Sequence, residues 1–411
     1  MGFKYGERAD YDIRANTDVD WAASVKYCKG SIEELKSRIE KYKEQVEFFS
    51  PQTIEFLKGM ANGAASQLDK SEYAKEGTNL ERIYNINISS ALVKIPTGCN
   101  GFWVGKQATK DGKSYATFHS QGRYMGNDIM ARHITFVAIP DDPKAHIVWM
   151  STIAGCIGRG GEIVNDAGVV NGLFASDSGD YPEEVNAYGV EPHLSRFHAL
   201  LYGDSAEKAA EIINLGTPEY REKTGRKTLL RARGVTLMFA DAGTCLMVSY
   251  TAGPYAIRRP GDLGEEGAGY ICQSNHNYQE FSYDENNEKT NIPMTKFAPE
   301  ETEKKDSSYW RFWSPMWAIR NNYGKIDLEM VLRELTALHD RYDKDGNKYE
   351  YEQGKSFCAH KFSKAGDPGG SYSPVVVVPE TLEIYEVPDW PCRYVNKSWN
   401  YINLNDFKAL R

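Results

Sequence analysis

The sequence predicts an α+β protein in which helices precede and separate clusters of short strands. Apolar residues recur at three- and four-residue helical spacing in the first part of the chain, whereas short aromatic and β-branched runs dominate after residue 99. One strand does not alternate regularly with one helix, so the pattern favours layered α+β architecture over a βαβ repeat. With 411 residues, 41% of them apolar, the chain can bury a large core.

Two helices are predicted before residue 99. The run SIEELKSRIEKYKEQVEFF starts at Ser31, and Glu34 follows at the spacing of a capping box. The next run, TIEFLKGMANGAASQL, places Gly59 and Gly63 beside alanines at helical spacing. Small residues on one face suit close packing of this second helix against another element.

Short strands are predicted from Cys99 onward, in the runs NGFWVG, SYATFHS, HITFVAIP and HIVWMST. The sequence Lys-Asp-Gly-Lys at 110–113 predicts a hairpin turn after the first of them, and residues 165–168 predict another tight turn. The glycine-rich stretch 158–161 lacks the spacing and the lysine of a phosphate loop, so it is interpreted as a flexible turn with Arg159 as a candidate ligand contact.

The second half repeats both kinds of element. The run LSRFHALLYGDSAEKAAEIINLG predicts a helical region with Asp204 or Ser205 as a cap and Gly216 as its end. Strand patterns follow in TLMFADAG and TCLMVSYTAG, a helix is predicted over 326–339, and strands return in SPVVVVPE and TLEIYEVP.

Charge and hydropathy narrow the class of partner. The net charge of -8 and the lack of a long basic run argue against nucleic acid or an anionic membrane surface. No stretch approaches the ~18 apolar residues of a membrane span. The first thirty residues lack the apolar core of a signal peptide, which predicts a cytoplasmic protein, although a chain trimmed of its leader would look the same. Small-molecule or peptide-like partners are expected, and a homo-oligomer is left open.

The seven cysteines are scattered singly, without a CxxC pair or close His/Cys spacing. This pattern predicts buried free thiols, with neither a disulfide framework nor a metal site. Residues 341–352 imitate a calcium loop, but Arg341 at the first ligand position would repel a cation, so an exposed turn is expected.

The pair Gly98-Cys99 in IPTGCNGFWVG raises three alternatives: a core cysteine, a metal ligand, or a nucleophile that becomes a new N-terminus. Gly98 leaves its carbonyl open to attack by the Cys99 thiol, and Pro96 stiffens the approach. Cleavage through the resulting thioester would free an α-amine able to take the proton of its own thiol.

The run YICQSNHNYQEF places Asn275 and His276 at the end of a short strand, where side chains can face a cleft. The amide of Asn275 could donate to an oxyanion in acyl transfer. An Asx-turn in a polar loop is the structural alternative.

An ordered set of motifs resembles a known family. LKGMANGAA, IYNINISSAL, Gly98-Cys99, GKQATKDGK, IVNDAGVV, SNH, SSYWRFW, NNYGKID, SFCAH and the final GGSYSPVVVVPETLEIYEVPDWPC occur in consistent order over about residues 45–395. Together they resemble the acyl-coenzyme A:6-aminopenicillanate acyltransferase family, the C45 group of N-terminal nucleophile (Ntn) hydrolases.

The resemblance implies a self-processing amidohydrolase or acyltransferase with an αββα sandwich of four layers. Residues 1–98 would form a mainly helical prosegment or α chain, and residues 99–411 the catalytic β chain, folded as one unit. Cys99 would be both the autoproteolysis residue, cutting after Gly98, and the acyl-accepting nucleophile. Asn275 and a backbone N–H near Ala175 would stabilise the oxyanion, with His276 and Arg311 as further oxyanion or substrate candidates. The substrate would be a small amide, with no metal or organic cofactor.

Departures from the family pattern concern the residues around the α-amine and the substrate. Gln121 stands where the family has an aspartate, unless Asp128 takes that place after an insertion, and Ala359 replaces a basic residue after Cys358. His119 or Arg123 would then contact the substrate. A dipeptidase or phospholipase-B-like hydrolase on the same scaffold, and an uncleaved binding protein without activity, are the alternatives.

Overall fold

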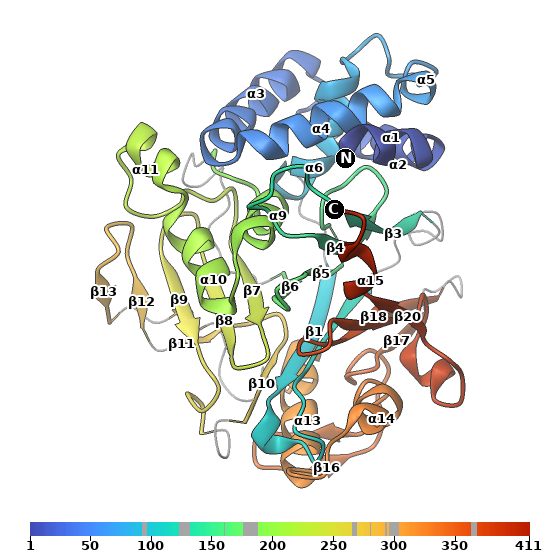
Figure 1. The fold of residues 1–411 in the computed structure, drawn as a ribbon, viewed down its shortest axis with the longest axis vertical. Helices are drawn as coiled ribbons and strands as arrows, with labels where there is room; N and C mark the ends of the chain where they lie inside the picture. The colour runs from blue at the N-terminus through green and yellow to red at the C-terminus, as the bar shows by residue number, and fades with distance from the viewer. Residues whose placement is uncertain are drawn as a thin grey trace.

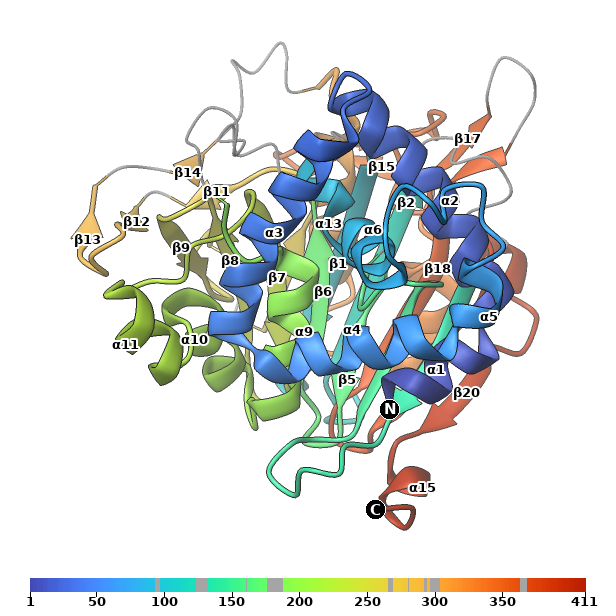
Figure 2. The same ribbon diagram turned by 90° about the horizontal axis from the view of Figure 1, so that it is seen from above.

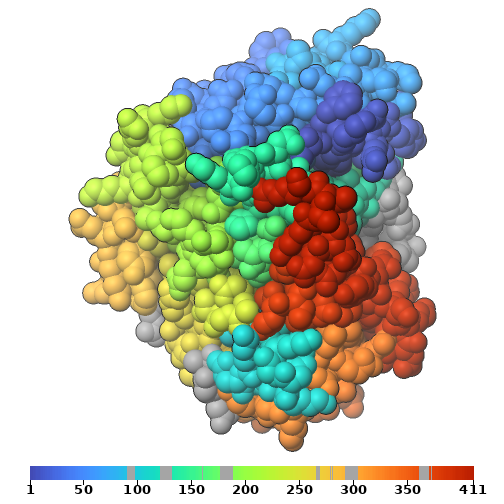
Figure 3. Space-filling model, viewed as in Figure 1, coloured from blue at the N-terminus to red at the C-terminus, as the bar shows by residue number. Residues whose placement is uncertain are grey.

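Helices occupy the chain from its start to Leu92 and form a cap over one side of the molecule (Figure 1 and Figure 3). The computed structural model describes residues 1–92, 97–122, 132–159, 161–175, 188–264, 269–279, 281–291, 294–295, 304–362 and 368–411. The helices of the cap are α1 (Gly2–Arg8), α2 (Asp10–Tyr27), α3 (Ile32–Phe49), α4 (Pro51–Gly63), α5 (Ala65–Leu68) and α6 (Asn79–Leu92).

The predicted start of α3 is confirmed. The hydroxyl of Ser31 accepts a hydrogen bond from the backbone N–H of Glu34 at 3.1 Å, as an N-cap should. The Glu34 carboxylate pairs with Arg38 at 2.7 Å, one turn further along the helix. The hydrogen bond to the serine side chain of the predicted capping box is therefore observed. The glutamate side chain instead forms an i,i+4 ion pair.

The small residues of α4 pack against α1, as predicted for a close-packed helix face. A methyl group added at Gly63 would lie 2.1 Å from the carbonyl oxygen of Phe3, and one added at Gly6 would lie 2.2 Å from that of Met60. Backbone therefore contacts backbone between these helices, and both sides of the contact require glycine.

Two antiparallel sheets form the body of the molecule within the described ranges. The first has the strand order β10-β1-β2-β18-β19-β20, with β17 paired to β18. Its strands are β1 (Thr97–Val104), β2 (Tyr115–Gly122), β10 (Tyr270–Gln273), β17 (His360–Phe362), β18 (Pro368–Val378), β19 (Glu383–Glu386) and β20 (Asn400–Asn403).

The second sheet has the order β13-β12-β9-β8-β7-β6-β5-β4-β3. Its strands are β3 (His133–Ala138), β4 (Val148–Ile153), β5 (Ile163–Asn165), β6 (Val170–Phe174), β7 (Val235–Ala240), β8 (Cys245–Tyr250), β9 (Tyr255–Arg258), β12 (Ser282–Tyr283) and β13 (Lys289–Thr290). The combination of helices with antiparallel sheets confirms the predicted α+β class. The strands and tight turns predicted from the sequence are also observed.

Three apolar clusters join these parts. One lies between the two sheets and combines Trp103 and Phe118 of the first with Trp149, Met238 and Met247 of the second. A second cluster joins the other face of the second sheet to the helical cap and to α9 (Pro192–Tyr202) and α10 (Ala206–Leu215). Figure 2 shows α3, α4, α6 and α9 lying across this side. A third joins the other face of the first sheet to α13 (Ser307–Asn321).

The loop after β4 ties the cap to the second sheet. Arg159 is buried there, and it pairs with Asp20 of α2 at 3.0 Å. Asn87 of α6 donates to the loop backbone at 2.9 Å, and Asn16 of α2 does so at the same distance. The expectation that Arg159 contacts a ligand is therefore wrong, because its guanidinium holds the cap in place.

Several later elements refine the predictions. The predicted helical region is divided into α9 and α10, with Ser205 as the cap of the second and Gly216, at φ +74°, as its end. The helix predicted over 326–339 is shorter: α14 (Leu328–Met330) continues into the π-helical turn η3 (Val331–Leu335).

The remaining elements are short. They are η1 (Lys106–Ala108), α11 (Pro218–Thr224), β11 (Tyr278–Gln279) paired with β14 (Met294–Thr295), β15 (Arg341–Tyr342) paired with β16 (Lys348–Tyr349), η4 (Pro391–Tyr394) and α15 (Asn405–Lys408). The β15–β16 hairpin is the turn expected in place of a calcium loop, with Arg341 bound to Glu352 at 2.7 Å. Every helix of the described ranges is too short or too polar to cross a bilayer.

Candidate active site

Cys99 lies in β1 on the face that meets the second sheet. Its partner in β2 is Ser120, and on the other side β1 pairs with β10 from Gly101 onward. Because side chains alternate along a strand, Cys99 and Trp103 enter the cluster between the sheets, while Phe102 joins the opposite face. The side chain is 5% exposed, so its surroundings rather than bulk solvent set its reactivity.

The backbone of Cys99 is held by two side chains predicted from the sequence. Its N–H donates to Oδ1 of Asn275 at 2.8 Å, and its carbonyl accepts from Nη1 of Arg311. Nη2 of Arg311 also donates to Oδ1 of Asn275 at 2.8 Å. The structure therefore brings Cys99, Asn275 and Arg311 into one hydrogen-bonded group, although they are far apart in the sequence.

Asn275 is itself fixed from both ends. It follows β10, and its backbone N–H donates to Oγ of Ser308, the second residue of α13, at 2.8 Å. Its side-chain Nδ2 donates to the carbonyl of Ala175 at 2.6 Å. Two donors converge on Oδ1 and one acceptor faces Nδ2, so the orientation of the amide follows from its partners.

The role predicted for Ala175 differs from the contact observed. The resemblance implies a backbone N–H here as an oxyanion donor, whereas the structure presents the Ala175 carbonyl to Asn275. That carbonyl accepts a hydrogen bond from one of the two N–H groups of Nδ2. The other N–H group can donate to a further acceptor. Ala175 thus positions the asparagine in this state of the chain.

Two buried arginines lie within electrostatic reach of the Cys99 sulfur. Burial lowers the pKa of Arg311 and of Arg196 to about 10, while the neighbouring Cys99 acts in the opposite direction on both. Both guanidinium groups therefore remain protonated near neutral pH. Positive charge beside a thiol favours its thiolate form, which is the nucleophilic one.

Sequence reasoning missed Arg196. It lies in α9, and its Nη2 donates to the carbonyls of Gly161 at 2.6 Å and Asn171 at 3.2 Å. The signal was present in LSRFHALL, because an arginine within an apolar helical run needs a buried partner. Which partner it finds depends on the packing of α9 on the second sheet, which the local sequence does not contain.

His119 lies on the other face of the first sheet from Cys99, which corrects its expected contact with substrate. It pairs with Asn100 across β1 and β2, and its ring centre lies 4.6 Å from that of Phe357. Neither ring nitrogen has a hydrogen-bond partner among the described residues. Burial lowers the pKa of His119 to about 3, so the ring is neutral.

The side chain of His276 contacts other buried side chains. Its Nδ1 shares a hydrogen bond with Oγ of Ser308 at 2.7 Å, and its ring lies 5.1 Å from that of Phe312. Burial, followed by the charges of Arg311 and Arg258, holds the pKa of His276 well below its usual range. Oγ of Ser308 also accepts the backbone N–H of Asn275. We therefore assign His276 to positioning Asn275 through Ser308, in place of the expected oxyanion or substrate contact.

The remaining candidates lie at the edge of the described chain. Gly98 pairs with Gln121 at the start of β1, directly before Cys99. Arg123 and Asp128 lie outside the described residues, as does Pro96. The group that would replace the family aspartate therefore stays a prediction.

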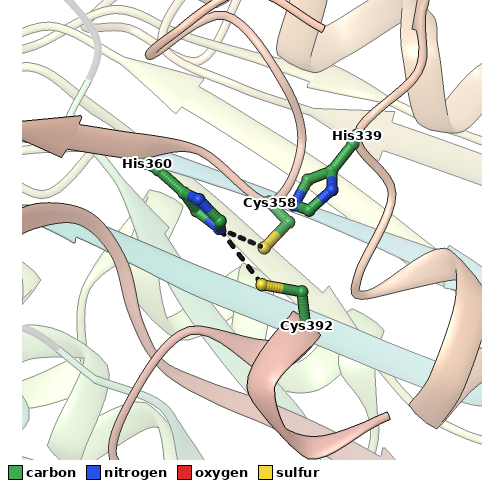
Figure 4. Close-up of side chains that lie close together, drawn as sticks. All are labelled: His339, Cys358, His360 and Cys392. Atoms are coloured by element: carbon green, nitrogen blue, oxygen red, sulfur yellow. Dashed lines mark hydrogen bonds between the residues drawn. The ribbon is translucent and has the colours of Figure 1, made fainter.

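A second group of reactive side chains lies apart from this site. One ligand atom each from His339, Cys358, His360 and Cys392 lies within 4.8 Å of the others (Figure 4). The prediction that the scattered cysteines and histidines form no metal site is therefore wrong about their proximity. Folding collects residues that are far apart in the sequence. Cys358-x-His360 is a close pair, so the statement that no cysteine and histidine are closely spaced is also wrong.

Comparisons with known proteins give distant similarity in structure alone. No family model matches the chain, and no curated protein matches it. A mutant of the conjugated bile acid hydrolase from Clostridium perfringens aligns at 11% identity and a TM-score of 0.39, over 75% of this chain and 93% of that one. A second variant of that hydrolase gives 12% identity with the same TM-score and coverage.

The penicillin V acylase from Agrobacterium tumefaciens gives 11% identity and a TM-score of 0.39, over 75% of this chain and 86% of that one. Because these scores and identities are low, the similarity assigns neither a family nor an activity to this chain. The functional argument therefore depends on the residues around Cys99.

Proposed function

We propose that this protein is a self-processing cysteine amidohydrolase or acyltransferase of the Ntn type, with Cys99 as its nucleophile. The main observation behind the proposal is that two side chains form hydrogen bonds with the Cys99 backbone. The N–H that cleavage would turn into an α-amine is bonded to Asn275, and the carbonyl beside it is bonded to Arg311.

Processing begins with attack of the Cys99 sulfur on the carbonyl carbon of Gly98. The bond between that carbon and the Cys99 nitrogen breaks, and the nitrogen takes up the proton released by the thiol. Gly98 is then held as a thioester, which water hydrolyses to a carboxylate and a free thiol. Oδ1 of Asn275 accepts from this nitrogen before the cut and can accept from the amine afterwards, so the new N-terminus keeps its anchor.

Turnover uses the same atoms in a second role. The α-amine takes the proton of the Cys99 thiol, and the sulfur attacks the substrate amide. We assign the proton of Asn275 Nδ2 that does not face Ala175 to the developing oxyanion. Such a donor is worth about 2.7–4 kcal/mol in acyl transfer. The amine product leaves, and water or a second amine takes the acyl group from the thioester.

The arrangement of the apolar clusters supports the proposal. Helices against one sheet, that sheet against the second, and α13 against the far side correspond to the αββα order that the family resemblance implies. Residues 1–98 would then be the α chain and residues 99–411 the β chain. The charges of Arg196 and Arg311 near the Cys99 sulfur also support the proposal, because positive charge favours a thiolate.

Intact mass under denaturing conditions tests the processing step. The wild-type protein should give two species that divide between Gly98 and Cys99, whereas Cys99→Ala should give one. Cys28→Ala, which removes a buried thiol of the helical cap, should divide like the wild type. A divided Cys99→Ala chain, or one that turns over substrate, would disprove the mechanism.

The divided protein is then offered matched acyl-amine, dipeptide and ester substrates. Faster turnover of the acyl-amine would support the amidohydrolase assignment, and a preference for the other two would favour the dipeptidase or phospholipase-B-like alternatives. A chain that stays whole, with Cys99 alkylated no faster than the other thiols, would instead favour an inactive binding protein.

A further inference from the structure

We propose that His339, Cys358, His360 and Cys392 bind one zinc ion that stabilises the C-terminal part of the fold. These side chains come from other segments than Cys99, and the proposed activity does not use them. Figure 4 shows the four side chains close together. The zinc site therefore goes beyond the proposed function and can be tested separately from it.

The spacing of the ligand atoms fits a tetrahedral ion. Nε2 of His360 lies 3.6 Å from Sγ of Cys358 and 3.1 Å from Sγ of Cys392. A tetrahedral zinc ion with Zn–S near 2.3 Å and Zn–N near 2.0–2.1 Å places sulfur and nitrogen about 3.6 Å apart. The two His360–sulfur separations are thus close to those of a bound ion, and all four ligand atoms lie within 4.8 Å of one another, so side-chain shifts would complete the site.

The donor set selects the metal. Two sulfurs with two imidazole nitrogens are the ligands of closed structural zinc sites, whereas calcium and magnesium take oxygen. Because the protein supplies all four positions, none is left for water or substrate. The expected role is therefore structural and not catalytic.

Aromatic packing orients the two imidazole rings before any ion binds. The ring of His360 stacks on Trp390, with centres 4.1 Å apart and planes 11° from parallel. The ring of His339 stands nearly perpendicular to that of His360, at 4.9 Å. Nε2 of His339 is buried, yet it makes no hydrogen bond of standard geometry within the described residues. A metal ion would supply a partner for an imidazole nitrogen of this kind.

The ligands come from segments that are far apart in the sequence. His339 follows η3, Cys358 and His360 flank the start of β17, and Cys392 lies in η4. One ion would fasten these segments together and close a long loop of chain, which removes entropy from the unfolded state.

The site also braces the strand that carries the nucleophile. Phe357 directly precedes Cys358, and its carbonyl accepts from Nδ2 of Asn100, the residue after Cys99, at 3.0 Å. Its ring contacts that of His119 on β2. Loss of the ion would therefore loosen the support beneath β1 without touching the thiol itself.

Metal analysis of the full-length protein, purified under reducing conditions and dialysed against metal-free buffer, tests the proposal. We expect about one zinc per chain. Cys392→Ser and the double variant Cys358→Ser/Cys392→Ser should each lose most of it. Cys28→Ser and Cys99→Ala remove thiols outside the cluster and should keep it. Wild-type protein that stays free of zinc after incubation with the ion, or ligand variants that retain it, would overturn the proposal.

Cobalt substitution tests the ligands without relying on a variant that folds. Metal-free wild-type protein loaded with Co²⁺ should show intense visible bands of a tetrahedral ion and thiolate-to-cobalt absorption in the near ultraviolet. The weak spectrum of an octahedral ion would contradict the site. So would a Cys358–Cys392 disulfide that survives reduction, because it would consume both sulfurs.

Discussion

At the scale of single residues, Cys99 is one of several buried thiols that lie near an arginine. Burial raises the pKa of Cys156 to about 12 and also raises that of Cys245 well above its usual value, although a nearby arginine acts in the opposite direction on each. Cys99 is nearly as buried, and Arg196 and Arg311 lie within electrostatic reach of it. The effect of an arginine on the reactivity of Cys99 is therefore measured by substitution.

Removing the charge of Arg311 should slow the reaction of Cys99. We expect Arg311→Gln to lower its alkylation rate about 10-fold, because a change of one pKa unit in a thiol alters its thiolate fraction by that factor. Arg311→Lys, which keeps the charge but loses the two-pronged contact, should lose less. The measurement is the rate of iodoacetamide labelling at Cys99, followed by peptide mass.

Arg320→Gln is the matched control, since it removes one exposed arginine near the end of the same helix, α13. It should leave the labelling rate unchanged. Equal rates in Arg311→Gln and the wild type would show that the guanidinium acts only as a structural tie.

The residues of the candidate site could be named from the sequence only where a local motif marked them. Cys99 follows a glycine near the start of a strand, and Asn275 lies just after the end of one, so local patterns mark both. Arg196 and the cluster around Cys392 are not marked in this way, because their partners are chosen by contacts between distant segments. His119 was misassigned for a similar reason: the register of β1 and β2 decides which face it occupies.

At the scale of elements, the contact of α1 with α4 is held by backbone rather than by side chains. Gly2 and Gly6 of α1 meet α4, and Gly59 and Gly63 of α4 meet α1, with almost no space for a methyl group. Close approach replaces the interlocking side chains that usually join two helices. The contact is therefore sensitive to the smallest possible enlargement.

Gly63→Ala should destabilise the protein by about 1–3 kcal/mol, the usual cost of overpacking. Alanine favours a helix over glycine by about 1 kcal/mol, so a loss of stability would have to come from the clash with Phe3. Urea denaturation measures the change. Asn62→Ala, at the exposed neighbouring position of α4, should be neutral or slightly stabilising. A stable Gly63→Ala protein would mean that α1 can move away without cost.

Local patterns predicted the strands better than the late helix. Runs such as HIVWMST are dense in residues that favour strands, and their burial on both faces agrees with that propensity. The helix predicted to reach His339 ends earlier. There the carbonyl of Leu338 accepts the backbone N–H of Cys358 at 3.0 Å, which diverts the chain toward the cysteine and histidine cluster. A tertiary contact has overridden a local preference.

At the scale of the whole molecule, buried neutral histidines set the response to acid. Burial lowers the pKa of His119 to about 3 and that of His198 to about 4, and it is the largest cause of the low pKa values of His193 and His276. In the unfolded chain each would titrate near 6.5. Between the low pKa values of the folded state and 6.5, the native state therefore binds fewer protons than the unfolded state.

Stability should therefore be full above about pH 6.5 and fall as the pH decreases toward 4, by up to about 1.4 kcal/mol per pH unit for each histidine. Urea denaturation at pH 7, 6 and 5 measures the slope. His119→Met should make it shallower, because one uncharged buried ring is removed. An unchanged slope in His119→Met would contradict this account.

The hydrogen bonds between the helical cap and the loop after β4 carry one more consequence. Arg159, Asn16, Asn87 and the Tyr5 hydroxyl would join the two sides of a cut at Gly98 as they join the intact chain. The severed cap would stay bound as the small partner of a heterodimer. Cleavage at Gly98 would then leave the elution volume in gel filtration unchanged. A fully cleaved preparation would therefore elute like one intact protein.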